Sequence, residues 1–213
     1  MAAQWAQDNG ISEFKIGYEL EMKADKTTLT ILQLIANLKI LATDVKAIFT
    51  NGNLCYSCFH ENIDDWVTVG KGNIDILASN VYREWGNHNP IPWQSEIDTL
   101  VSAFGVGGTY LTEFSLNTNG VDAYYEDELV QATAITEMID YIKASGMERA
   151  YFFMYANVDW ISGFEVLKDD GAYRLLWNQA LLNTEPVKFA TVPTKTTTIS
   201  LPDTITLIPK ITR

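Results

Sequence analysis

Two glutamates, Glu19 and Glu113, occur in the same local setting in two distant parts of the sequence. Each follows or ends a short β-prone run, residues 14–18 and 110–114, and a glycine-rich turn at 105–108 precedes the second run. At the carboxyl ends of two parallel strands, one carboxyl group can protonate a glycosidic oxygen while the other attacks or stabilises the anomeric carbon. Each acid could instead cap the following helix or pair with a nearby lysine at the surface.

A second candidate for chemistry is the CxxC pair of Cys55 and Cys58, with His60 two residues further on. Such a pair can pack in a core, form a redox couple or a disulfide, or supply half of a zinc site. Zinc would need two more ligands, and His88 is the only other histidine. A redox couple would need a thioredoxin-like helix start, which the sequence does not show. We favour packing over the other three readings, and we expect neither a metal nor another cofactor.

Strand-like and helix-like segments alternate along the chain and would position these residues. The expected helices are 2–9, 28–43, 63–69, 93–104, 126–145 and 172–182, and the expected strands are 14–18, 45–50, 74–82, 110–114 and 149–155. The helix at 126–145, for example, has apolar residues at i, i+3, i+4 and i+7 from Ile135. Repeated βα units predict an α/β fold with a parallel sheet and helices outside it.

The composition of the chain changes after about residue 183. Residues 191–213 are rich in Thr, Ile and Pro and contain one acid, Asp203. Prolines among extended-looking segments are typical of short edge strands. We therefore expect a domain over residues 1–190 and an extended C-terminal tail over 191–213. The tail could add a strand to a partner or pack back on its own domain.

Length and charge exclude several classes of protein. The chain has 213 residues, 47% apolar and 20% charged, which suits one globular domain. A net charge of −12 without a basic stripe argues against a nucleic-acid partner. No apolar run approaches the roughly 20 residues of a membrane span, and the start has no signal-peptide pattern. We expect a soluble protein, and its compartment is left open.

Four segments, residues 16–21, 74–82, 110–114 and 164–173, resemble the second half of a retaining glycoside hydrolase of the (β/α)8-barrel clan with two catalytic glutamates. The resemblance covers roughly residues 2–190. It implies a partial TIM-type barrel of about five βα units, corresponding to strands four to eight. Glu19 then matches the acid/base, Glu113 the nucleophile, Tyr82 a tyrosine that donates a hydrogen bond to the nucleophile, and Trp160 a sugar-stacking residue.

Further side chains are candidates for contact with a sugar. Trp85 and His88 lie in a long polar loop, and Asn80 and Asn157 lie at strand ends. Four of the candidates also have a purely structural interpretation. Tyr82 and Trp160 could be packed aromatic residues, and Trp85 and His88 could anchor the loop.

Two departures from the family pattern affect these expectations. Tyr18 occupies the place where the family usually has an asparagine, which would bind the sugar 2-OH. Tyr18 is a candidate for that contact, although its hydroxyl has a different reach and geometry. Five βα units also cannot close an eight-stranded barrel, and the chain begins just before strand four. The missing strands could come from another polypeptide, which we favour, or from self-association. The chain could also no longer cleave sugars.

The resulting hypothesis is a retaining O-glycosyl hydrolase that needs a complementing chain. The alternative is a non-catalytic carbohydrate-binding or structural subunit derived from such a barrel. A doubly wound nucleotide-binding fold is not supported, because no glycine-rich loop follows any expected strand.

Overall fold

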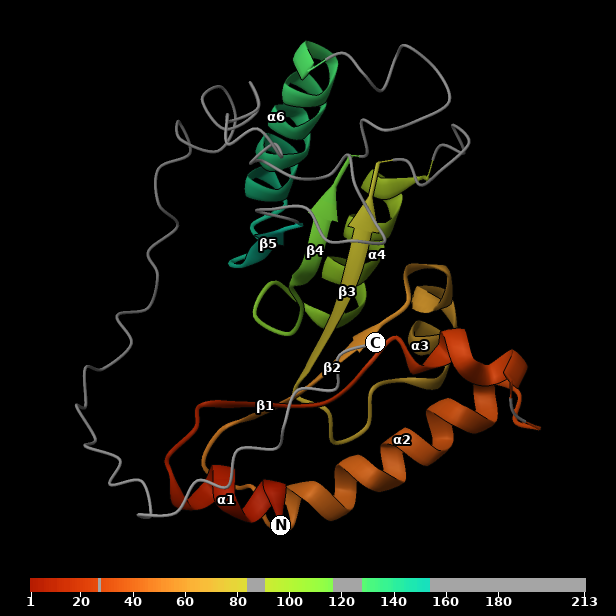
Figure 1. Cartoon of the computed structure of the whole chain (residues 1–213), viewed down its shortest axis with the longest axis vertical. Coiled ribbons are helices and arrows are strands. Elements are labelled where there is room, and N and C mark those ends of the chain that lie inside the picture. Colours follow the sequence, from red (N-terminus) through yellow and green to blue (C-terminus); the bar gives the residue numbers. More distant parts are fainter. Residues whose placement is uncertain (27, 84–90, 117–127, 154–213) are drawn as a thin grey trace, which may run out of the picture.

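The computed structural model describes residues 1–26, 28–83, 91–116 and 128–153 (Figure 1). Helices and strands alternate along these ranges. In chain order they are α1 (Ala2–Asp8), β1 (Glu13–Tyr18), the 3₁₀ segment η1 (Leu20–Lys26), α2 (Ile31–Lys46), β2 (Asn53–Cys58), the 3₁₀ turn η2 (His60–Asn62), α3 (Ile63–Val69), β3 (Ile76–Tyr82), α4 (Trp93–Phe104), β4 (Leu111–Ser115), α6 (Glu128–Ala144) and β5 (Ala150–Phe152).

The five strands form one parallel sheet in the order β1-β2-β3-β4-β5. Each strand therefore pairs with the next one along the chain, which Figure 1 shows as a continuous succession. Because crossovers between parallel strands are right-handed, this order places successive helices on the same face of the sheet. Consistent with this, α2 contacts α3, and α3 contacts α4. A doubly wound sheet would reverse its strand order instead. The expected α/β fold is confirmed, with five parallel strands in barrel-like order and helices between them in the described part of the chain.

The sheet is strongly curved, as shown by a contact between a side chain of β1 and a side chain next to β5. Arg149, directly before β5, donates to Glu13 of β1 with Nη1···Oε2 at 2.7 Å. In a flat sheet these two edge strands would be about 19 Å apart, at about 4.8 Å per strand. Tyr110 lies between them, donating to Glu13 at 2.8 Å and stacking under the Arg149 guanidinium at 4.2 Å. The sheet therefore has a concave face on which side chains from both edges meet, as in a barrel interior.

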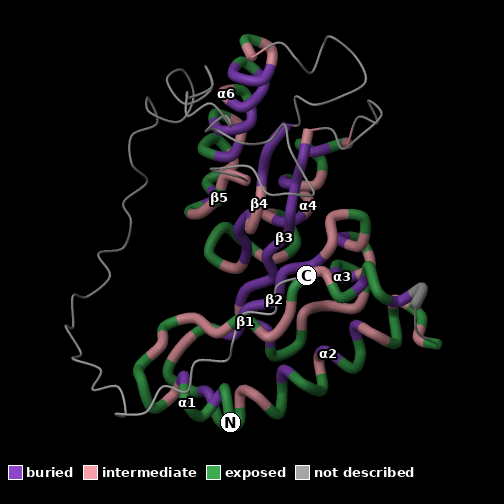
Figure 2. Tube along the Cα trace, in the orientation of Figure 1, coloured by how far each residue is buried: buried purple, intermediate pink, exposed green. Residues whose placement is uncertain are grey.

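The main core lies between the convex face of the sheet and the helices. It joins strand residues such as Leu54, Leu77 and Leu111 to helix residues such as Ile35 and Ile97. Figure 2 shows β3 buried along its length, whereas α2 alternates between buried and exposed residues. β4 is buried at both ends and partly buried at Thr112 and Glu113. A smaller apolar cluster lies on the concave face and contains only strand and strand-flanking residues, namely Cys55, Ile76, Ala78 and Tyr110.

The second strand differs from the sequence prediction. Residues 45–50 were expected to form it, but α2 continues through Lys46, and the strand is β2, Asn53–Cys58. Val45 keeps the helical apolar spacing of Leu38 and Ala42, and Phe49 packs in a separate cluster with α1. The Asn51-Gly52 turn thus precedes the strand instead of ending it. The helix also starts later than expected, since Thr30 and Gln33 form a capping box.

The observed position of β2 distinguishes among the possible roles of the CxxC pair. Cys55 and Cys58 are three residues apart on β2, so their side chains point to opposite faces of the sheet. Cys55 lies in the concave cluster and Cys58 in the convex core, and both are buried free thiols. Burial raises the pKa of Cys55 to about 11, which keeps it a thiol. Both residues pack in the core, as favoured, and the pair forms no disulfide.

Several predictions lie outside the described residues. These are Trp85, His88, Asn157 and Trp160, the helix at 172–182, and the division between a domain of residues 1–190 and a tail of 191–213. In the ranges that the structure covers, no helix is long and apolar enough to cross a bilayer.

Candidate active site

Two β-bulges shape the carboxyl end of the concave face. Between the pairs Lys15↔Cys55 and Tyr18↔Ser57, β1 advances three residues while β2 advances two. Strict alternation would send Lys15 and Tyr18 to opposite faces. The extra residue puts both on the concave face, where the Lys15 Nζ lies 5.4 Å from the centre of the Tyr18 ring. The bulge therefore turns Tyr18 into the site.

The second bulge lies in β4, where Ser79↔Leu111 is followed by Asn80↔Glu113. Thr112 and Glu113 are consecutive, yet both contact residues of the concave face. Thr112 bonds to Asn80 at 2.6 Å, while Glu113 accepts hydrogen bonds from tyrosine hydroxyls. Bulges often re-aim side chains beside active sites, and this one presents Glu113 to the same cluster as Tyr18.

Glu113 is held by two phenols. Tyr18 donates to Oε1 and Tyr82 donates to Oε2. Burial, followed by the hydrogen bond to Glu113, raises the pKa of Tyr18. Burial, followed by the charge of Glu113, raises the pKa of Tyr82. Both hydroxyls therefore remain protonated near neutral pH and act as donors to the carboxylate. The contact between Tyr82 and Glu113 is the one expected from the sequence.

Glu19 follows β1 in an unusual backbone conformation, with φ of 46°. Residues with a side chain seldom adopt this left-handed region, and such strain is concentrated at functional sites. Its amide donates to the Ser57 carbonyl at 2.8 Å. Burial, and next the nearby charge of Glu113, raise the pKa of Glu19 from 4.5 to about 7, against opposing effects of Asn80 and His60. The carboxyl group can thus give and take a proton near neutral pH.

Asn80 of β3 connects the two carboxylates. It is 2% exposed, and its Nδ2 donates to Glu19 Oε1 at 2.7 Å and to the Tyr18 hydroxyl at 2.6 Å. Tyr18 in turn donates to Glu113, so three consecutive hydrogen bonds join Glu19 to Glu113. Both amide hydrogens of Asn80 are therefore used, and its carbonyl oxygen accepts from Thr112, so any ligand would have to displace one of these bonds or share the carbonyl oxygen.

Five of the predicted site residues thus meet in one cluster at the carboxyl end of the sheet, namely Tyr18, Glu19, Asn80, Tyr82 and Glu113. Ser57 and Thr112 extend it and were missed; their hydroxyls are 2.5 Å apart. Ser57 could have been found as a polar residue between Tyr56 and Cys58 in a buried strand. It was missed because the second strand was predicted at residues 45–50. Among the described residues, no group of three or more His, Cys, Asp or Glu could hold a metal ion.

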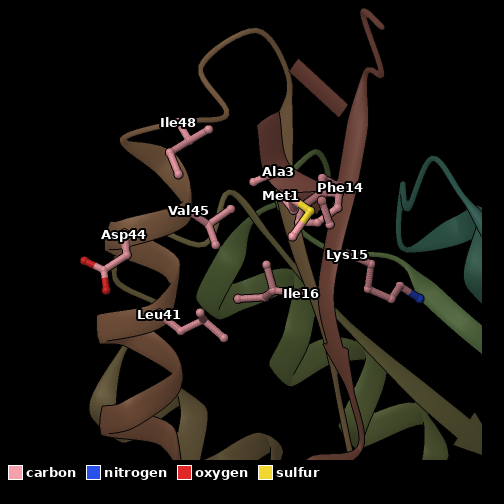
Figure 3. Close-up of a pocket in the computed structure, with 10 residues that line it drawn as sticks. Met1, Ala3, Phe14, Lys15, Ile16, Leu41, Asp44, Val45 and Ile48 are labelled. Atoms are coloured by element: carbon pink, nitrogen blue, oxygen red, sulfur yellow. The ribbon is translucent and has the colours of Figure 1, made fainter. Parts of the chain in front are cut away.

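A groove of about 350 Å³ lies elsewhere, beside β1, and its lining is mostly apolar. Figure 3 shows Leu41 and Val45 of α2, and Ile48 just after it, facing Phe14 and Ile16 of β1. The Lys15 side chain points away from these residues (Figure 3), and its Nζ lies 6.0 Å from the ring centre of Tyr110 in the concave cluster. The groove is therefore on the convex side and is separate from the carboxylate cluster.

No protein-family model matches the sequence, and no match is found among the curated proteins. Among solved structures, the chain is similar to a psychrophilic glycoside hydrolase family 10 endo-β-1,4-xylanase, with a TM-score of 0.49 and 12% sequence identity. The similarity covers 71% of this chain and 52% of that one. The chain therefore spans about half the length of that enzyme.

Proposed function

We propose that this chain carries a glycosidase-type site and cleaves a glycosidic bond with retention of configuration. The observation that supports the proposal is the pair of carboxylates joined through Asn80 and Tyr18, in which Glu19 has a pKa of about 7. A general acid in such a pair must hold its proton near neutral pH, and burial beside a second carboxylate provides this.

In the proposed mechanism, Glu113 attacks the anomeric carbon while protonated Glu19 gives its proton to the glycosidic oxygen, and the alcohol leaves. Ionised Glu19 then removes a proton from water, which attacks the glycosyl ester and releases Glu113. Tyr82 and Tyr18 hold Glu113 from both oxygens during this cycle. Three consecutive hydrogen bonds place the two carboxyl groups in one site, and retention itself is taken from the family resemblance of the sequence.

The alternative is a non-catalytic carbohydrate-binding or structural subunit. One observation favours it: both oxygens of Glu113 accept a tyrosine hydroxyl, so a nucleophile would have to act while engaged on both sides.

We propose that another polypeptide supplies further βα units, because the five strands found in the described residues do not close a barrel. Among the described residues, β1 pairs only with β2, and the apolar groove lies along this edge strand. Edge strands with apolar surroundings are usually covered. Light scattering with intact mass spectrometry tests this point. A stable complex with a second chain supports it, and a well-folded monomer contradicts it.

The variant Glu113→Gln distinguishes the glycoside hydrolase from the non-catalytic subunit. Hydrolysis of aryl glycosides by the purified native complex should fall by at least about 1,000-fold in this variant, because the nucleophile is lost while the shape is kept. Binding of oligosaccharides, measured by calorimetry, should survive. Glu148→Gln, an exposed change of the same kind, is the control and should keep full activity. Sugar binding without turnover in the unmodified protein would instead support the non-catalytic subunit.

A further inference from the structure

The backbone at Glu19 needs support from its surroundings. With φ of 46°, Glu19 lies where a residue with a Cβ is strained, and nothing in its own side chain favours that region. Its amide bonds to Ser57, and its carbonyl accepts from the Met22 amide at 3.2 Å. These two hydrogen bonds involve only the backbone of Glu19. Other groups must therefore fix the peptide units of residues 20 and 21.

Glu21, two residues further on, is a buried carboxylate that takes no part in the proposed chemistry. It is 3% exposed. Its Oε2 accepts from the Tyr56 hydroxyl at 2.7 Å, and its Oε1 accepts from the Trp66 indole Nε1 at 2.6 Å. In the described part of the chain it forms no ion pair. A buried carboxylate supported by neutral donors is costly to desolvate, so its donors must be well placed.

Tyr56 connects Glu21 to the backbone of the same turn. Its hydroxyl accepts from the Leu20 amide at 3.0 Å while it donates to Glu21. Burial, and then the charge of Glu21, raise the pKa of Tyr56, so the hydroxyl stays protonated and serves as donor and acceptor together. The Tyr56 ring is fully buried with its centre 5.2 Å from that of Trp66. Residues 19, 20 and 21 are therefore each attached to β2 or α3.

We propose that Glu21 is a positioning residue: through Tyr56 and Trp66 it fixes the turn that holds Glu19 in its left-handed conformation and directs its carboxyl group at Asn80. This inference rests on the proposed function for its catalytic consequence, but the positioning itself has a readout that requires no substrate. Without Glu21, Tyr56 and Trp66 would lose their acceptor, and the turn would sample other conformations in which Glu19 leaves Asn80.

The test uses three variants of the full chain. Glu21→Gln replaces one acceptor oxygen by a donor, which conflicts with Tyr56 or Trp66. Tyr56→Phe keeps the charge of Glu21 and removes only the hydroxyl link, so it separates positioning from electrostatics and remains informative if Glu21→Gln does not fold. Glu61→Gln removes an exposed carboxylate from the same end of the sheet and is the control.

Amide hydrogen exchange measured by NMR at Glu19 and Leu20 is the primary readout. Protection should fall about tenfold or more in Glu21→Gln and Tyr56→Phe and stay unchanged in Glu61→Gln. With an active complex, kcat should fall by a similar factor while KM changes little. Unchanged protection and unchanged kcat in both folded variants would overturn the proposal. Lost protection in a protein that never hydrolyses a glycoside would retain the positioning role and reject the proposed function.

The pH dependence of the Glu19 titration, followed by carboxyl NMR, gives a second readout. The groups that face Glu19 are Tyr18 of β1, Asn80 of β3, Glu113 of β4, His60 of η2 and Glu21 itself. Glu21→Gln removes one of the charges that raise this pKa, so the midpoint should move downward, and Glu61→Gln should leave it in place. An unchanged midpoint in Glu21→Gln would contradict the coupling between the two carboxylates.

Discussion

Glu19 and Glu113 carry the same side chain, and their neighbours make them different. Glu113 receives two phenol hydroxyls, whereas Glu19 receives one amide hydrogen and faces the charge of Glu113. Burial and this charge favour the neutral form of Glu19. A pair of like groups whose environments differ in this way is the usual basis for assigning an acid and a nucleophile.

The raised pKa of Glu19 predicts a specific effect of pH on stability. The folded protein holds this proton up to about pH 7, and the unfolded chain loses it near 4.5. Folding therefore binds a proton between these values, and stability contributed by this group decreases as the pH rises through that window. Glu19→Gln should add roughly 1–2 kcal/mol to the free energy of unfolding at pH 8 and little at pH 4, after allowing for partial exposure of the carboxyl.

Urea denaturation at the two pH values measures this difference, with Glu61→Gln as the control. An equal change at both pH values would show that Glu19 ionises in the folded state as it does in the unfolded chain. A gain in stability on removing Glu19 would match the general conflict between stability and function at active sites, as the proposed role of this residue predicts.

At the scale of single elements, the bulge in β1 is the decisive feature. Gly17 lies within it, and a Cβ at this position would be 2.7 Å from the Tyr56 ring and 3.1 Å from a Leu20 methyl group. The close approach of β1 to Tyr56 therefore requires glycine. The same approach lets Tyr56 reach the Leu20 amide and Glu21.

Gly17→Ala should reduce the free energy of unfolding by about 1–3 kcal/mol, because the fully buried Tyr56 ring has no free space to move into. It should also reduce the proposed hydrolysis by displacing Tyr18 and Glu19. Gly107→Ala is the matched control, since its Cβ would meet nothing within 4 Å and no positive φ is recorded there. Chemical denaturation of both variants makes the measurement, and equal stabilities would show that β1 can move away from Tyr56 without cost.

At the scale of the whole molecule, curvature of the sheet brings distant strands together. Tyr18 and Glu113 are 95 residues apart in the sequence, and Glu13 and Arg149 are 136 apart. The first contact joins β1 to β4 at the carboxyl end, and the second joins β1 to the start of β5 at the opposite end. Side-chain hydrogen bonds therefore span the concave face at both ends of the sheet.

The Glu13–Arg149 pair should contribute a measurable coupling between the two edges. A double-mutant cycle with Glu13→Gln and Arg149→Gln should give about 1 kcal/mol, since both side chains are only partly exposed and Tyr110 contacts each of them. The coupling should decrease at high salt. Additive effects of the two substitutions would mean that the curvature is maintained by backbone pairing alone.

Local patterns allowed most elements to be predicted. The helix at 93–104 was predicted at the bounds it has, and the strands at 14–18 and 110–114 were placed within a residue of β1 and β4. The failure at residues 45–50 has a local cause, since a short apolar run is compatible with the end of a helix as well as with a buried strand. That failure also concealed Ser57 and the opposite orientation of the two cysteines.

The sequence by itself determined the α/β class, the alternation of elements and the two glutamates at strand ends, because side-chain periodicity and carboxylate placement are local properties. Only the tertiary structure decided that Tyr18 and Glu113 share one face, since each bulge is defined by pairing with a neighbouring strand. The raised pKa of Glu19 and the support from Glu21 likewise depend on burial and on groups from other strands. Burial and long-range proximity are properties of the folded chain and leave no signature in local spacing.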